Sequence, residues 1–144
     1  MIDEVKVKII KPWLDSIVPI PLMPASVPAG FPSPAQDHLD LAIDLNKDLI
    51  DNPDATFYGR VSGDSMIGEG IGDGDLMVID RSVEPKHGHI AVCSIDGDFT
   101  LKKIEIDSTG LWLVPSNPKF KRILVKEEDD FIVWGVVKHV IKSF

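Results

Sequence analysis

A serine on a glycine-rich turn is the feature of this sequence that could do chemistry. Ser65 stands in the segment Val61-Ser62-Gly63-Asp64-Ser65-Met66, between a β-prone run that begins at Thr56 and a second run from Leu76 to Asp80. A serine on a tight turn exposes its hydroxyl, and the backbone N–H groups beside it can converge on one point. An acyl-transfer nucleophile and its oxyanion hole need this arrangement, although most Gly-Asp-Ser segments are ordinary loops. Ser65 is therefore a candidate nucleophile that the rest of the chain has to support.

A lysine on a predicted hairpin is the second candidate. Asp96-Gly97 between two β-prone runs is typical of a two-residue type I′ turn, and this turn sets Lys102 opposite Ala91. Strand alternation then puts Lys102 on one face together with Thr100 and Ile104. A lysine in that place either extends along the sheet edge or is buried, and burial disfavours its charged form. A buried Lys102 would be a neutral amine that can act as a general base, whereas a lysine at a sheet edge is the ordinary alternative.

The composition is that of one ordinary globular domain. The chain has 144 residues, of which 44% are apolar and 26% charged, and its formal net charge is −8. This negative charge argues against direct, non-specific binding to nucleic acid or to an anionic membrane. The single cysteine, Cys93, excludes an internal disulfide and fits a reducing cytoplasm, and no pattern of Cys and His suggests a metal site.

The first 34 residues differ from the rest of the chain. Seven of the eleven prolines lie there, and these residues break any helix or central strand. The segment is too interrupted for a membrane span or a signal peptide, and too short for a helix-turn-helix domain. It is nevertheless fairly apolar, and Trp13 would be costly to expose. We expect an extended arm that lies on a folded surface.

One helix and then a run of strands are predicted after the arm. Ser33 can serve as N-cap and Pro34 as the first residue of a helix whose apolar residues run as far as Leu45. From Thr56 onward the sequence is β-prone, so we expect a mainly β fold of several short strands with one small helix. The predicted strands are residues 57–62, 76–80, 89–95, 99–106, 111–114, 122–125 and 131–141.

Taken together, these motifs resemble the LexA/UmuD group of self-cleaving serine proteases, and UmuD-type proteins most of all. The resemblance covers roughly residues 24–142, with the motifs in the same order as in that group. It rests on Ala29-Gly30-Phe31-Pro32-Ser33-Pro34, Gly63-Asp64-Ser65-Met66, Gly72-Asp73-Gly74-Asp75-Leu76, Gly97-Asp98-Phe99-Thr100-Leu101-Lys102-Lys103 and Gly135-Val136-Val137.

The resemblance implies a role for each of these positions. Ser65 corresponds to the nucleophile and Lys102, 37 residues later, to its unprotonated base, while Ala29-Gly30 corresponds to the scissile bond. Cleavage there would remove an arm of residues 1–29 and leave a domain of residues 30–144. Supporting roles fall to Thr100, which could orient the lysine amine, to the backbone N–H groups of Asp64 and Ser65 as oxyanion donors, and to Met66, which could line the site. UmuD-type proteins often have Cys before the scissile Gly, and Ala29 is the LexA-like choice at that position.

The resemblance also implies a setting and partners. A RecA–single-stranded-DNA filament stimulates the cut during the SOS response to DNA damage, and the processed homodimer joins a UmuC-type translesion polymerase in the cytoplasm. No cofactor, metal, membrane or direct nucleic-acid contact is implied. Two alternatives remain: a non-catalytic regulatory module of the same fold that binds a polymerase, and a Ser/Lys peptidase that acts in trans. The sequence leaves the role of residues 1–11, the cleavage rate and the choice between cleavage within and between subunits open.

Overall fold

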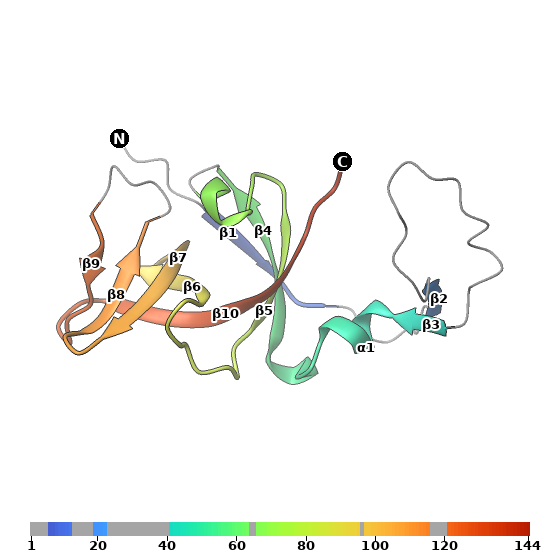
Figure 1. Ribbon diagram of the computed structural model, residues 1–144, viewed down its shortest axis with the longest axis horizontal. Coiled ribbons are helices and arrows are strands. Elements are labelled where there is room, and N and C mark those ends of the chain that lie inside the picture. Colours follow the sequence, from blue (N-terminus) through green and yellow to red (C-terminus); the bar gives the residue numbers. More distant parts are fainter. Residues whose placement is uncertain (1–5, 13–18, 23–40, 64–65, 96, 116–120) are drawn as a thin grey trace. The chain divides into compact units, whose positions relative to one another are not determined.

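The chain consists of two compact units. A computed structural model describes residues 6–12, 19–22, 41–63, 66–95, 97–115 and 121–144 (Figure 1). One unit comprises Met1–Pro12 together with Asp54–Phe144, and the other comprises Trp13–Pro53. Each unit is described by itself below.

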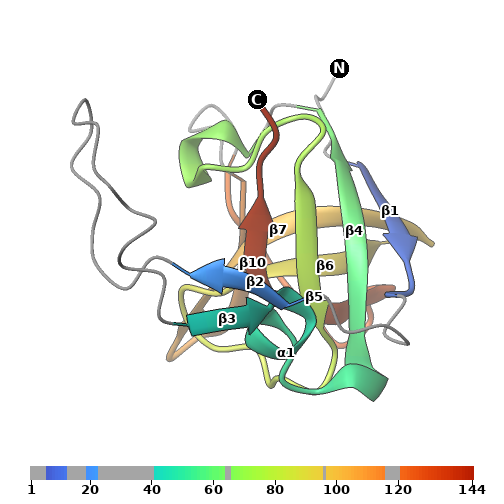
Figure 2. The same cartoon turned by 90° about the vertical axis from the view of Figure 1, so that its right-hand side faces the viewer.

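The larger unit is an antiparallel sheet of eight strands. Figures 1 and 2 show its course from two sides. Its strand order is β1-β4-β5-β10-β6-β7-β8-β9, so β10 lies between strands that precede it in the sequence. The strands are β1 (Lys6–Ile10), β4 (Thr56–Ser62), β5 (Leu76–Asp80), β6 (Ile90–Ile95), β7 (Asp98–Asp107), β8 (Gly110–Val114), β9 (Ile123–Leu124) and β10 (Phe131–Ile141).

The sheet curls so that β1, at one edge, also lies next to β7. Two hydrophobic clusters fill the interior and are separated by the alternation of side chains along β6 and β7. The larger cluster contains Val7, Val61, Met66, Ile71, Met77, Ile79, Val92 and Leu101, and the smaller contains Ala91, Cys93, Ile104 and Leu113. Side chains on both faces of β6 and β7 are buried in these clusters. Apolar residues therefore follow one another in these strands, without a strict alternation of apolar and polar residues.

Two glycines in the sheet allow close packing between neighbouring strands. A Cβ on Gly59 of β4 would lie 2.7 Å from Val7 Cγ1 and 2.8 Å from Ile79 Cδ1. A Cβ on Gly135 of β10 would lie 2.6 Å from Ile79 Cγ2. Both positions therefore exclude a side chain, because the atoms that would clash belong to the packed core.

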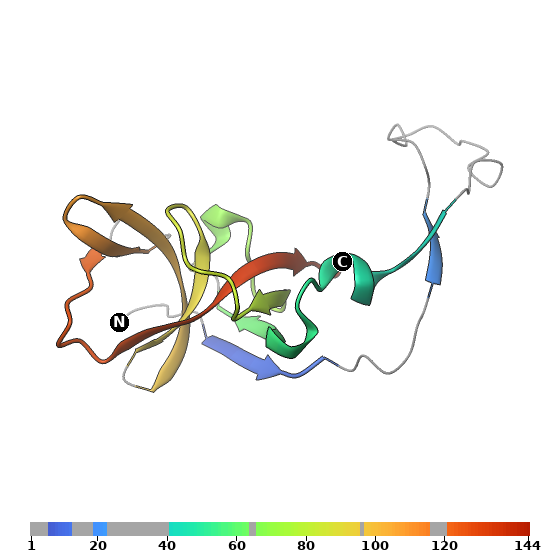
Figure 3. The ribbon, with the colours of Figure 1, turned by 90° about the horizontal axis from the view of Figure 1, so that it is seen from below.

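The smaller unit contains a two-stranded sheet followed by one short helix. Strands β2 (Pro19–Leu22) and β3 (Leu41–Asp44) pair antiparallel, and α1 (Leu45–Leu49) follows β3 directly (Figure 3). Asp44 is the N-cap, and its Oδ1 accepts a hydrogen bond from the Asn46 N–H at 3.1 Å. A 3-10 turn, η2 (Pro53–Ala55), leads into the larger unit.

The predicted helix was wrong in its extent. Residues 41–44 form a strand instead, and the helix begins after Asp44, whose carboxylate caps it. The proposed cap Ser33 and first residue Pro34 lie outside the described residues. The mainly β fold with one small helix is confirmed, and so is the hairpin register, which pairs Lys102 with Ala91. The prediction of an extended arm did not include one element: residues 6–10 form strand β1 of the main sheet.

Candidate active site

The turn that carries the candidate serine is held on its N-terminal side by an aspartate. Strand β4 ends at Ser62, and Gly63 takes a φ of 100°, which a residue with a side chain rarely adopts. The Gly63 N–H donates a hydrogen bond of 2.9 Å to Asp73 Oδ1. Asp64 and Ser65 come next in the chain and lie outside the described residues.

The same turn is held on its C-terminal side by a buried methionine. Met66 is 1% exposed and lies in the larger hydrophobic cluster. Its carbonyl oxygen accepts hydrogen bonds from the N–H groups of Glu69 at 3.0 Å and Ile71 at 3.2 Å, which close the 3-10 turn η3 (Ile67–Glu69). The residues on both sides of positions 64–65 therefore have fixed anchors.

Asp75 connects the segment before β5 to the residue that follows the C-terminal strand. Its carboxylate accepts a 2.8 Å hydrogen bond from the Gly72 N–H and forms an ion pair with Lys142, which follows β10. Burial raises the pKa of Asp75, but the Gly72 hydrogen bond and the Lys142 ammonium outweigh that effect and hold the pKa below its ordinary value. Backbone hydrogen bonds from Val61 N–H to Asp75 O (3.0 Å) and from Gly74 N–H to Val61 O (2.8 Å) complete the connection to β4.

We expect Asp75→Asn to lower the free energy of unfolding at pH 7. We also expect this free energy to fall less between pH 7 and pH 3 in the variant than in the wild type. A carboxyl whose pKa is lower in the folded than in the unfolded chain contributes stability above its unfolded pKa of about 3.9, and this contribution is lost as the pH falls through the folded-state pKa. The asparagine keeps the shape and an acceptor for Gly72 but loses the charge that attracts Lys142. Urea denaturation at pH 7 and pH 3 measures the effect: equal differences between variant and wild type at both pH values would contradict it.

Lys102 lies on the face of β7 that was predicted for it. It is half-buried and stands between the buried residues Thr100 and Ile104, with Ala91 opposite it on β6. The fully buried Cys93, the partner of Thr100, lies close enough for the positive charge of Lys102 to act on its thiol. Burial raises the pKa of Cys93 to about 12, and the charge of Lys102 offsets only part of that rise. Lys102 thus shares its face of β7 with Thr100 and Ile104, and Cys93 stays a neutral thiol.

The neighbouring lysine, Lys103, makes a different contact. Its Nζ lies 3.5 Å from Glu69 Oε1 of η3, and the two side chains are 35% and 29% exposed. Leu101, on the same face of β7 as Lys103, packs in the cluster that contains Met66. Lys103 is therefore engaged by a carboxylate, whereas Lys102 has no ion pair among the described residues.

The structure describes only some of the predicted site residues. Lys102 and Thr100 share one face of β7, and Met66 begins the turn after the serine position. Asp64, Ser65, Ala29 and Gly30 lie outside the described residues, so their roles stay predictions. Asp73 and Asp75 were interpreted as turn residues, and their hydrogen bonds to the N–H groups of Gly63 and Gly72 agree with that, whereas Lys142 was missed. The repeated Gly-Asp in Gly72-Asp73-Gly74-Asp75 was the signal for the two aspartates, whereas nothing in the sequence pairs Lys142 with the turn.

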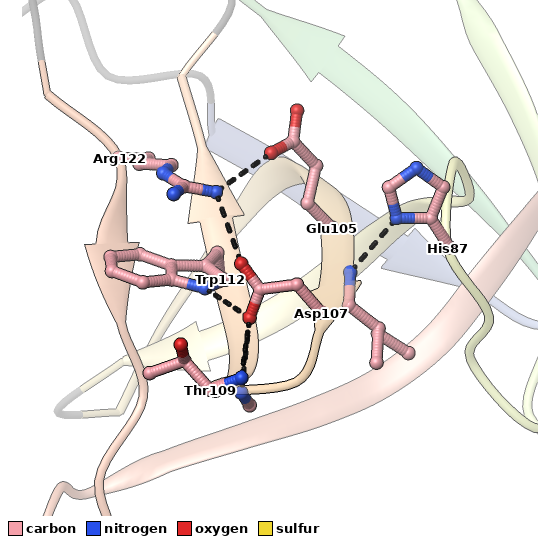
Figure 4. A network of polar contacts seen from close by, with 8 residues as sticks. His87, Glu105, Asp107, Thr109, Trp112 and Arg122 are labelled. Carbon is pink, nitrogen blue, oxygen red and sulfur yellow. Dashed lines mark hydrogen bonds and ion pairs between the residues drawn. The ribbon is translucent and has the colours of Figure 1, made fainter.

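A second polar cluster joins β7, β8 and the residue just before β9 (Figure 4). Asp107 Oδ1 accepts hydrogen bonds from Trp112 Nε1 at 3.0 Å and from the Thr109 N–H at 2.9 Å, and the first of these is the main reason that the pKa of Asp107 is lowered. Arg122 stacks 3.9 Å from the Trp112 ring and forms ion pairs with Glu105 and Asp107. The cluster fastens the two-residue strand β9 to the sheet.

Neither a metal site nor a membrane span is found in the part of the chain that the structure describes. No group of three or more His, Cys, Asp or Glu side chains there could hold a metal ion. None of the described helices is long and apolar enough to cross a membrane.

Comparison with known proteins identifies the class. The sequence model of the Peptidase S24-like family matches residues 21–138, a range that includes both Ser65 and Lys102. The chain therefore belongs to the Peptidase S24-like family. It is 41% identical over 122 residues to Protein ImpA of Escherichia coli, a match that covers 84% of this chain and 82% of the relative.

Two further relatives narrow the class. Protein MucA of Escherichia coli is 37% identical over 121 residues, which cover 83% of this chain and 82% of the relative. LexA repressor 1 of Xanthomonas campestris is 35% identical over 130 residues, covering 90% of this chain and 63% of the repressor. The chain is a UmuD-type member of the LexA/UmuD group, the SOS-mutagenesis type within this family of self-cleaving serine peptidases.

Proposed function

We propose that this protein cuts its own chain between Ala29 and Gly30 by a Ser/Lys mechanism. The observation that supports the proposal most is the position of Lys102 on an apolar face of β7, together with a serine turn that is anchored on both sides. Lys102 lies beside the buried Cys93 and between the buried residues Thr100 and Ile104. Lys102 follows Ser65 by 37 residues, which is the spacing that the resemblance to the LexA/UmuD group implies for the nucleophile and its base.

The reaction follows from these roles. Neutral Lys102 accepts the Ser65 hydroxyl proton as Oγ attacks the Ala29 carbonyl carbon, and the oxyanion that forms is stabilised by the backbone N–H groups of Asp64 and Ser65. The C–N bond to Gly30 then breaks, and the proton passes from Lys102 to the departing amine. Water hydrolyses the Ser65 ester by the same base and restores the hydroxyl. Thr100 positions the Lys102 amine, and Met66 borders the site.

The setting of this reaction is the response to DNA damage. We propose that a RecA–single-stranded-DNA filament stimulates the cut in the cytoplasm, and that residues 30–144 then act as a homodimer with the catalytic subunit of a UmuC-type translesion polymerase. The similarity to ImpA and MucA along more than four-fifths of each chain supports this setting. The arm carries three acidic and three basic residues, so its removal leaves the net charge at −8. Activation would therefore expose surface without changing the overall electrostatics.

Intact-mass analysis of the full chain incubated with activated RecA filaments tests the proposal. We expect two products, residues 1–29 and 30–144, and the same products more slowly at alkaline pH without the filament. A Ser65→Ala chain is the matched control and should stay whole under both conditions. Cutting at another bond would move the scissile site, and an uncut wild-type chain would favour the non-catalytic regulatory module. Cleavage of unrelated peptides would favour a peptidase that acts in trans.

A further inference from the structure

The first strand of the chain closes one edge of the main sheet. β1 pairs antiparallel with β4 over five residues, from Lys6 opposite Ser62 to Ile10 opposite Tyr58. Figure 2 shows β1 (blue) as the outermost strand beside β4 (green). β4 is the strand that runs directly into the turn of Ser65. Within the described part of the chain, β1 is the strand that pairs with β4 on this side.

β1 is fitted to this edge by specific side chains. Val7 is 8% exposed and lies over Gly59, where a Cβ would approach Val7 Cγ1 to 2.7 Å. Ile9 packs against the same hydrophobic cluster. Beyond the strand, Lys11 Nζ donates a hydrogen bond of 3.1 Å to Thr56 O and lies 4.3 Å from the centre of the Phe57 ring. The strand that fits this edge therefore has a simple pattern. Two β-branched apolar residues, Val7 and Ile9, are separated by one residue, and Lys11 follows two positions later.

The chain connects β1 to β4 through a separate unit. Met1–Pro12 belongs to the same compact unit as Asp54–Phe144, and residues 13–53 between them form the other unit. The bond between Ala29 and Gly30 lies in that connection. A cut there leaves every contact of β1 with β4 intact, yet it removes the tether that keeps the strand at high effective concentration. A five-residue strand without a tether would then exchange with free competitors.

We propose that the outer edge of β4 is a docking site for an extended segment of a partner protein and that β1 is its built-in occupant. The partner segment would add antiparallel to β4 and repeat the chemistry of β1, with small β-branched residues over Gly59 and a lysine near Phe57. A basic segment suits a chain whose net charge is −8. Only the natural release of β1 rests on the proposed self-cleavage; the docking edge itself is a property of the sheet.

The test uses full-length chains that all carry Ser65→Ala, so that its outcome does not depend on cleavage. The probe is a fluorescent peptide of residues 1–12, and binding is measured by anisotropy. Val7→Asp places a charge in the core and should eject β1 from its edge, whereas Ile10→Asp makes the same change at a position that is 40% exposed. The Val7→Asp chain should bind the peptide at least ~10-fold more tightly than the unmutated chain, because its own strand no longer competes. Ile10→Asp should bind like the unmutated chain.

Two further measurements test whether the peptide binds at the edge of β4. A peptide with its own Val7→Asp change should bind the Val7→Asp chain at least ~10-fold more weakly than the natural peptide, since it cannot fill the space over Gly59. Val7→Ala only loosens β1, so it should give intermediate binding even if the aspartate variant does not fold. Equal binding by all chains, or no binding by the Val7 variants, would overturn the proposal. Self-association of the Val7→Asp chain without peptide would show that the edge takes a second copy, and it would equally overturn a partner-strand role.

Discussion

Lys102→Arg should abolish self-cleavage, with a rate loss of about 100- to 10,000-fold, the usual contribution of a general base. A guanidinium stays protonated at any usable pH, so it cannot accept the Ser65 proton. Arginine is similar in length to lysine, and position 102 is only half-buried, so the fold should persist. Intact-mass time courses with RecA filaments, alongside circular dichroism, measure both properties.

The pH dependence of the wild-type chain gives the same assignment a second readout. A general base acts only in its unprotonated form, so the rate of spontaneous cleavage should rise with pH, by up to about tenfold per pH unit. The Lys102→Arg chain should show no such rise.

Lys103→Ala is the matched control for this assignment. Its side chain pairs with Glu69, and a half-exposed ion pair contributes at most about 1 kcal/mol to stability. The variant should therefore cleave at nearly the wild-type rate. If Lys103 proves essential while Lys102 does not, or if cleavage is flat from about pH 6 to 10, the base has been assigned to the wrong residue.

Gly30→Val should slow cleavage by at least ~100-fold, an effect similar to that of Lys102→Arg. In the proposed reaction, the bond between Ala29 and Gly30 has to approach Ser65 closely, and a Cβ at position 30 would be in the way. A branched side chain at this position would displace the reacting carbonyl, whereas Gly30→Ala, the smaller step, should slow the reaction less. The fold and the proposed homodimer should be unchanged in both variants. Intact-mass analysis with RecA filaments measures the rates, and size-exclusion chromatography checks the assembly. A Gly30→Val chain that still yields residues 30–144 would show that the site is not tight at this position.

Much of the larger unit could be predicted because its signals are local. The Asp96-Gly97 turn set the register of β6 and β7, and this register placed Lys102 opposite Ala91. The bounds of β5 and β10 matched their apolar runs at both ends. A short loop and a two-residue period leave few alternatives.

The features that could not be predicted depend on contacts between distant residues. The alternation of Lys6, Val7, Lys8 and Ile9 is a strand pattern, but only the pairing with β4 and the space over Gly59 make it part of the sheet. The helix was placed too early because local propensity favoured residues 41–44 as helix, and pairing with β2 overrode it. The ion pair between Asp75 and Lys142 joins residues 67 positions apart, so no local sequence pattern indicates it.

The central place of β10 has a consequence for the order in which this protein folds. β1, β4 and β5 form one half of the sheet and β6 to β9 the other, and β10 pairs with β5 on one side and β6 on the other. The turn of Ser65 belongs to the first half and Lys102 to the second. Joining the halves requires contacts of long sequence separation, which form slowly. We therefore expect the proposed self-cleavage only in molecules whose last strand, β10, has joined the two halves.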